Sequence, residues 1–369
     1  MGVPLWVWAV TVVGSIALMV FDFYAHVRTP HEPSFKESAV WTGVYVALAV
    51  IFGVALTLVW GTGHGGEYFA GYVTEKSLSV DNLFVFLIIM TRFAVPRIYQ
   101  QKVLLVGVAI ALLLRGLFIA AGAAAIAQFS WVFYLFGAFL IYTAVKLARE
   151  DHDSEEPEEF HENRLLRLVR RLVPSTPEYH GDRLTAREGG RRLVTPMLVV
   201  MIAIGSTDVL FALDSIPAIF GLTKEPYIVF TTNVFALLGL RQLYFLLGGL
   251  LRRLVYLSEG LAIILGFIGV KLVLEALHTN ELPFLNGGQH VAWAPEIPIW
   301  LSLTIILGTL TVATVASLLK TRRDGRAVPV AAVPVGAEPG SEVGPEEGVR
   351  AASAVGRPSG SAGPDEPTA

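Results

Sequence analysis

The chain has 369 residues and a formal net charge of −3, and 54% of its residues are hydrophobic while only 16% are charged. Several apolar runs exceed the roughly 18 residues that signal a bilayer-spanning helix, so the composition excludes an ordinary soluble protein. A near-neutral charge offers nucleic acid no attraction. The absence of cysteine excludes disulfides, thiolate metal sites and cysteine catalysis.

Nine membrane spans are predicted. We expect an all-α, polytopic transmembrane bundle, because lipid cannot satisfy backbone polar groups and these runs are too long and unbroken for barrel strands. The predicted spans are residues 4–24, 38–60, 67–91, 101–126, 128–148, 194–220, 226–250, 258–278 and 297–319. They define a transmembrane domain over residues 1–320. A polar segment, 149–192, separates the fifth and sixth spans.

The end of the chain has a different composition. Residues 321–369 are rich in Ala, Val, Pro, Gly, Glu and Ser. Such a segment cannot bury a core and is predicted to be a disordered tail.

The distribution of basic residues predicts the orientation. Lys and Arg follow every odd-numbered span, and nine arginines lie in segment 149–192. The N-terminus and the even-numbered loops contain one basic residue, Lys224. The positive-inside rule therefore places the N-terminus outside, and segment 149–192 and the C-terminal tail in the cytoplasm.

Two stretches inside the spans repeat each other. TEKSLSVDN begins at Thr74 and TDVLFALDS begins at Thr207, and each places two carboxylates six residues apart. Arg115 and Arg241 then occupy the middle of spans four and seven. Because spans three and six cross in opposite directions, spans 3–5 and 6–8 are predicted to form inverted three-helix repeats, as in many secondary transporters.

The intramembrane acids are the candidate site, since each ionised group at the bilayer centre costs about 3 kcal/mol. The predicted metal ligands are Glu75, Asp81, Asn82, Asp208 and Asp214. Two explanations remain open: the acids bind a cation, or they form buried structural pairs with Arg115 and Arg241. An oxygen-only set of ligands suits Mg²⁺, Ca²⁺ or Mn²⁺, and ligand chemistry does not choose among them.

Helix geometry constrains how these acids can meet. Six residues along a regular helix leave two side chains about 120° apart. Either spans three and six unwind between their acids, as Pro217 would favour, or Asp81 and Asp214 meet across the repeat axis. Asn233 is equally suited to supplying an oxygen and to packing. Asp22 is predicted to be an interfacial carboxylate, with a gate as the alternative.

Four segments carry a family resemblance. YVTEKSLSVDNLFVF, TDVLFALDSIPAIFGLT, NVFALLGLRQLYFLL and FGAFLIYTAVKLA resemble the TerC family of bacterial membrane proteins, and within it the pH-responsive Alx branch. The resemblance runs from about residue 4 to residue 319. It implies membership of the LysE-type transporter superfamily, a bacterial cytoplasmic membrane and export of Mn²⁺.

The four acids match the family's intramembrane acids residue by residue. One departure concerns the position three residues before Asp208, where many members have Glu and this chain has Gly205. That departure bears on which ion is preferred.

The sequence therefore predicts a secondary transporter rather than an enzyme, since no short catalytic motif is present. Its partners would be the lipid bilayer and a divalent metal, with Mn²⁺ as the transported ion, proton exchange as one form of coupling, and no permanent cofactor. The alternative is a membrane scaffold of a metal or tellurite stress-resistance complex, in which the acids are structural.

Overall fold

The structure is a computed structural model that describes residues 2–28, 31–129, 131–149, 179–188, 191–247, 254–278, 291 and 294–323. Within these ranges the chain is mostly helical, as predicted. The helices are α1 (Leu5–Asp22) with its π-helical continuation η1 (Phe23–Val27), α2 (Phe35–Trp60), α3 (Thr62–Arg92), α4 (Arg97–Gln128), α5 (Val132–Arg149), α7 (Pro196–Phe220), α8 (Pro226–Leu237), α9 (Leu240–Leu247), α10 (Leu257–His278) and α11 (Ile299–Arg323). The first three residues of the predicted tail, 321–323, belong to α11, and the rest of the tail, 324–369, lies outside the described residues.

Local sequence explains where several helices begin. Ser34 caps α2, because the Glu37 amide donates to its hydroxyl at 3.2 Å and the Glu37 carboxylate accepts from the Ser34 amide at 3.4 Å. Helices α7 and α8 each begin with proline, whose fixed φ and missing N–H suit a first turn.

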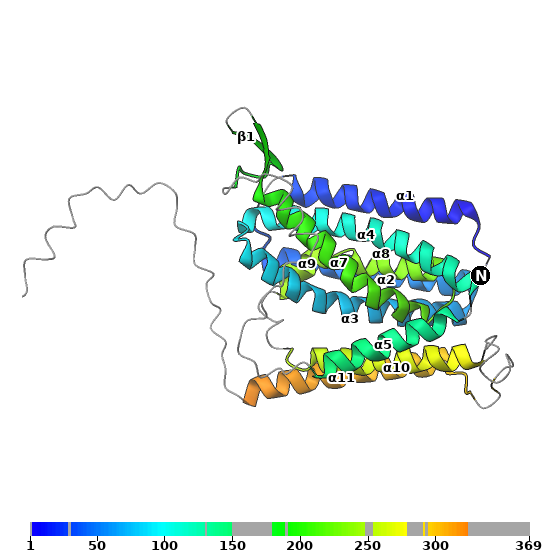
Figure 1. Cartoon of the computed structure of the whole chain (residues 1–369). Helices are drawn as coiled ribbons and strands as arrows, with labels where there is room; N and C mark the ends of the chain where they lie inside the picture. Colours follow the sequence, from blue (N-terminus) through cyan, green and yellow to red (C-terminus); the bar gives the residue numbers. More distant parts are fainter. Residues whose placement is uncertain are drawn as a thin grey trace, which may run out of the picture. The chain divides into compact units, whose positions relative to one another are not determined.

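Eight segments of the described chain are long and apolar enough to cross a membrane. They correspond to eight of the nine predicted spans, with α8 and α9 together forming the seventh. The remaining one, α3, is a 31-residue helix that carries too many charged residues to qualify by composition. In Figure 1, α1 begins at the marked N-terminus and α11 ends at the opposite end of the bundle, as nine crossings require.

A small hairpin departs from the all-α prediction. β1 (Thr185–Glu188) pairs antiparallel with β2 (Arg191–Val194) where the polar segment 149–192 joins the predicted sixth span. Lys102 at the start of α4 holds the approach to this hairpin through an ion pair with Asp182 at 2.7 Å. The hydrogen bond from Lys102 lowers the pKa of Asp182 below its usual range. Strands of four residues are too short for periodicity to reveal.

The two predicted repeats pack against each other helix by helix. α4 packs on α7, α3 packs on α8, and α5 packs on α10. At the last crossing the main chains approach so closely that a Cβ on Gly137 would lie 2.9 Å from the Gly269 carbonyl oxygen, and one on Gly269 would lie 3.0 Å from the Gly137 carbonyl oxygen. A two-fold axis would produce these reciprocal pairs, and the inverted repeat remains a prediction that this packing supports.

Candidate functional site

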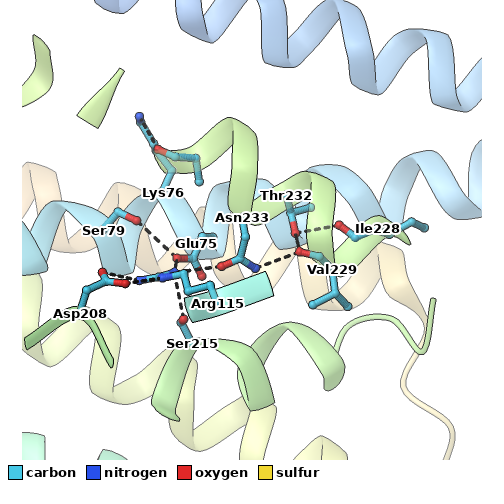
Figure 2. A network of polar contacts seen from close by, with 11 residues as sticks. Glu75, Lys76, Ser79, Arg115, Asp208, Ser215, Ile228, Val229, Thr232 and Asn233 are labelled. Atoms are coloured by element: carbon cyan, nitrogen blue, oxygen red, sulfur yellow. Dashed lines mark hydrogen bonds and ion pairs between the residues drawn. The ribbon is translucent and has the colours of Figure 1, made fainter. Parts of the chain in front are cut away.

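A network of buried polar side chains surrounds Arg115 of α4. Its guanidinium binds Asp208 of α7 with two hydrogen bonds, Nε to Oδ2 at 2.9 Å and Nη2 to Oδ1 at 3.0 Å. Its Nη1 forms an ion pair with Glu75 of α3 and donates to Ser215 Oγ at 3.2 Å and to Asn233 Oδ1 at 2.9 Å. Figure 2 shows these groups converging on the guanidinium from three other helices.

The network lies deep inside the bundle. Glu75 and Arg115 have no exposed surface and Asp208 is 1% exposed. At 1.5 Å per residue, each of the three lies about 18–27 Å from both ends of its helix. The hydrocarbon layer is about 30 Å thick, so these charges lie near its middle. Sequence repetition singled out Glu75 and Asp208, and the structure brings the two acids onto one cation.

The charges in this network do not balance. Two carboxylates face one guanidinium, so the cluster carries one net negative charge when all three groups are ionised. Glu75 Oε2 is buried and has no hydrogen-bond partner among the described residues. The Nδ2 of Asn82, two helical turns along the same face of α3, is likewise buried without a partner. An uncompensated buried carboxylate is costly, so the excess negative charge calls for a compensating group.

The other predicted ligands do not join this network. Asp214 accepts a hydrogen bond from Thr143 of α5 at 3.0 Å. Asp81 is half-buried on α3. No group of three or more acidic, histidine or cysteine side chains forms a metal cluster among the residues that the structure describes. Metal binding by Asp81, Asn82 and Asp214 therefore stays a prediction.

Of the two alternatives that helix geometry left open, the unwinding of spans three and six is wrong, and a meeting of Asp81 with Asp214 stays a prediction. Helix α3 is continuous from Glu75 to Asp81, and α7 is continuous from Asp208 through Pro217. The discontinuity lies in span seven, where α8 ends at Leu237 and α9 begins at Leu240. Pro217 breaks nothing because it lies in the last turn of α7, where the loss of one amide donor leaves the helix intact.

Comparison with known proteins identifies the family. The description "Integral membrane protein TerC family" matches residues 60–325. An uncharacterized membrane protein of Mycobacterium tuberculosis is 49% identical over 328 residues, covering 89% of this chain and 82% of the relative. The chain belongs to the TerC family.

Two further relatives carry more descriptive names. A protein of Salmonella typhi named "Putative membrane-bound redox modulator Alx" is 37% identical over 326 residues, covering 85% of this chain and 94% of the relative. The chloroplast thylakoid membrane protein TERC of Arabidopsis thaliana is 42% identical over 245 residues, covering 66% of this chain and 63% of the relative. No solved structure matches. The chain is therefore an integral, multi-pass membrane protein with bacterial relatives.

Glycines lie at the crossing of α4 and α7, and one of them is Gly205. A Cβ at Gly205 would lie 2.8 Å from Cγ2 of Ile110 on α4, and a Cβ at Gly107 of α4 would lie 2.6 Å from Cγ2 of Ile204. The paired glycines let α4 and α7 approach closely, which brings Arg115 within hydrogen-bond distance of Asp208. A side chain at position 205 would have to displace Ile110 at this crossing.

Arg241 has a partner that sequence reasoning missed. It was predicted to pair with the acids of spans three and six, and instead its Nη2 binds Asp22 Oδ1 of α1 at 2.8 Å. Asp22 is the last residue of α1, and its carboxylate is buried, at 5% exposure, rather than open to solvent; whether it lies at the membrane interface stays a prediction. Tyr45 Oη at 2.8 Å and Gln242 Nε2 at 3.0 Å donate to the same oxygen. Arg241 Nη1 also donates to Gln101 Oε1 of α4.

This second cluster lies at the end of the bundle that is predicted to face the cytoplasm. The sequence predicts Asp22 as the end of span one and Arg241 as the equivalent of Arg115, so it does not pair these two residues. A signal that could have joined them is charge counting, since a mid-span arginine requires a buried anion. The anion that Arg241 requires is Asp22.

Proposed function

We propose that this TerC-family protein is a secondary transporter that exports a divalent cation, Mn²⁺, from the cytoplasm. The observation that carries the proposal is the unbalanced pair of buried carboxylates, Glu75 and Asp208, which share Arg115 near the middle of the bilayer. A site with one negative charge in excess favours binding a proton or a metal ion. Exchange between those two occupants is the chemistry of a metal–proton antiporter.

The groups around Arg115 suit a hard cation. Glu75, Asp208, Ser215 and Asn233 contribute oxygens that all accept hydrogen bonds from the one guanidinium of Arg115. Oxygen ligands favour Mg²⁺, Ca²⁺ and Mn²⁺ over softer metals, and family resemblance selects Mn²⁺ among them. In the proposed cycle Arg115 holds both carboxylates when the cargo is absent, and moves off one of them when the cation binds.

The proposed placement is the bacterial cytoplasmic membrane, with the N-terminus outside and the C-terminus inside. In that orientation the Asp22–Arg241 cluster closes the cytoplasmic end, and the Arg115 network lies beyond it toward the outside. Cargo would pass the first cluster to reach the second.

One observation, the hydrogen bonding of Arg115, favours a second function. Arg115 satisfies most of its hydrogen-bonding groups without any cation, as a purely structural ion pair would. A membrane scaffold of a metal or tellurite stress-resistance complex, with structural acids, would show this geometry and carry no flux.

Transport by inside-out membrane vesicles separates the two functions. Uptake of Mn²⁺, Mg²⁺ and Ca²⁺ is measured with and without a pH gradient, for the natural chain and for Glu75→Gln, Asp208→Asn, Asp81→Asn and Asp214→Asn. Asp182→Asn is the matched control, since it removes an acid outside the bundle. We expect Glu75→Gln and Asp208→Asn to lose at least about tenfold in Mn²⁺ uptake, equivalent to about 1.4 kcal/mol.

The comparison among variants is decisive. Loss in Asp81→Asn and Asp214→Asn as well would extend the site to the acids outside the Arg115 network. If the natural chain takes up no more Mn²⁺ than vesicles that lack it, the transport proposal is wrong and the scaffold is favoured. If all four variants match a transporting natural chain at equal protein level, these carboxylates are not the transport site.

A further inference from the structure

Span seven is broken by its own backbone geometry. Gly239 has a φ of +79°, a conformation that other residues rarely adopt, and a Cβ there would lie 2.9 Å from Cβ of Tyr45. Leu238 N–H still donates to the Val234 carbonyl at 2.9 Å, and Leu243 N–H already donates to the Gly239 carbonyl at 3.0 Å. The helical hydrogen-bond series therefore stops and restarts inside the bundle.

The break exposes the negative end of a half-helix. Carbonyls in the last turn of a helix have no intrahelical amide, and the helix dipole adds partial negative charge there. The Ala236 carbonyl of this turn accepts a hydrogen bond from Nζ of Lys76 on α3 at 3.0 Å. A lysine side chain thus caps the carboxyl end of α8 in the middle of the bundle.

Lys76 has an unusual position for a membrane-embedded ammonium. It directly follows Glu75, yet Figure 2 shows it directed away from the Arg115 network, as a rotation of about 100° per residue requires. Among the described residues its one polar contact is the Ala236 carbonyl. The half-helix is therefore the negative group that compensates this ammonium.

A hollow adjoins the same break. Its lining residues come from the break and from α9, α1 and α4: Leu237, Leu238, Gly239, Arg241, Gln242, Met19, Asp22, Leu105 and Val108. Gln242 is 5% exposed, and its Oε1 has no hydrogen-bond partner in the described part of the chain. Because Gln242 Nε2 donates to Asp22 and Arg241 lines the same hollow, this oxygen belongs to the Asp22–Arg241 cluster, and the Ala236 carbonyl is the group that Lys76 contacts.

We propose that Lys76 is a tethered cation that fills a monovalent-cation site at the carboxyl end of α8. Transporters with broken helices coordinate monovalent coupling ions at unwound carbonyls and at half-helix carboxyl ends. Here the ammonium supplies that single positive charge from within the chain. The protein therefore needs neither Na⁺ nor K⁺ to hold this conformation, and removing the ammonium opens the site to one of them.

Thermal unfolding of the purified full-length chain in detergent tests this inference. The apparent Tm is measured in NaCl, KCl and choline chloride at equal concentration, for the natural chain, Lys76→Met, Lys76→Gln and Lys76→Arg. Lys76→Gln keeps a donor for the Ala236 carbonyl without the charge, so it covers the case in which Lys76→Met does not fold. Lys76→Arg is the control that keeps the charge.

We expect the natural chain and Lys76→Arg to have the same Tm in all three salts. The apparent Tm of the uncharged variants Lys76→Met and Lys76→Gln should be roughly 2 °C or more higher in NaCl or KCl than in choline chloride, because an ion that binds only the folded state stabilises it. The inference is overturned if the neutral variants respond to Na⁺ and K⁺ no more than the natural chain does, or if the natural chain itself responds. Transport is not measured, so this outcome is independent of whether Mn²⁺ export is found.

Discussion

Replacing Arg115 with methionine removes the cation from the central network and keeps a side chain of similar length. Glu75 and Asp208 then remain buried, at 0% and 1% exposure, with their main hydrogen-bond donor gone. Removing one partner of a buried ion pair costs about 3–5 kcal/mol. That is a large part of a total stability of about 5–15 kcal/mol.

The result is expected as a fall in Tm on the order of 5–10 °C in detergent, followed by tryptophan fluorescence and by size-exclusion elution. The matched control is the triple variant Arg115→Met, Glu75→Gln, Asp208→Asn, which removes all three charges together. Because neutral replacement of a buried ion cluster is often close to neutral in stability, the triple variant should recover most of the loss, to within about 2 kcal/mol of the natural chain.

Two results would refute this reasoning. If Arg115→Met is as stable as the natural chain, the two acids are already neutral and the arginine does not compensate them. If the triple variant is as unstable as Arg115→Met, the loss comes from packing around the guanidinium rather than from the uncompensated carboxylates.

Three further predictions follow from single positions. Gly239→Ala should lower the free energy of unfolding by about 2–3 kcal/mol, because alanine is strained at a φ of +79° and its Cβ would meet Tyr45. The control is Gly43→Ala in α2, which has open space around it and should change that free energy by less than about 1 kcal/mol. Asp22→Asn should lose about 3–5 kcal/mol by leaving Arg241 without its anion, and an equal loss in Tyr45→Phe would contradict the importance of that charge. Since the chain has no cysteine, a single introduced cysteine reports which side of the membrane it faces. A membrane-impermeant maleimide should label Gly63→Cys in intact cells and Arg187→Cys only in inside-out vesicles. Labelling of both variants in intact cells would overturn the proposed orientation.

The helices could be predicted from sequence because hydropathy is a local property. A run of apolar residues long enough to cross lipid must satisfy its own backbone, so composition alone predicts a helix there. The exception was the broken span seven. Gly239 does not stand out in LLGLRQ, since glycine is common in membrane helices, and only the packing of Tyr45 against the turn shows that this glycine is required.

The partners of the buried charges could not be predicted in the same way. Arg115 and Arg241 occupy similar places in their spans, and this similarity suggested similar roles. In the structure Arg115 joins Glu75 to Asp208, whereas Arg241 joins Asp22 to Gln101. Which helix face meets which is decided by close contacts such as Gly107 with Ile204, and hydropathy carries no information about them.

The sequence by itself determined that this chain is a membrane bundle, that acids repeat within two of its spans, and that its ligands for a metal would be oxygens. These conclusions depend on composition and on the cost of placing charge in lipid, which apply to each segment separately. The tertiary structure decided that Glu75 and Asp208 meet on Arg115, that α8 ends against Lys76, and that α3 and α7 stay continuous. Those outcomes depend on the rotation and separation of neighbouring helices, which are set by packing between residues far apart in the chain.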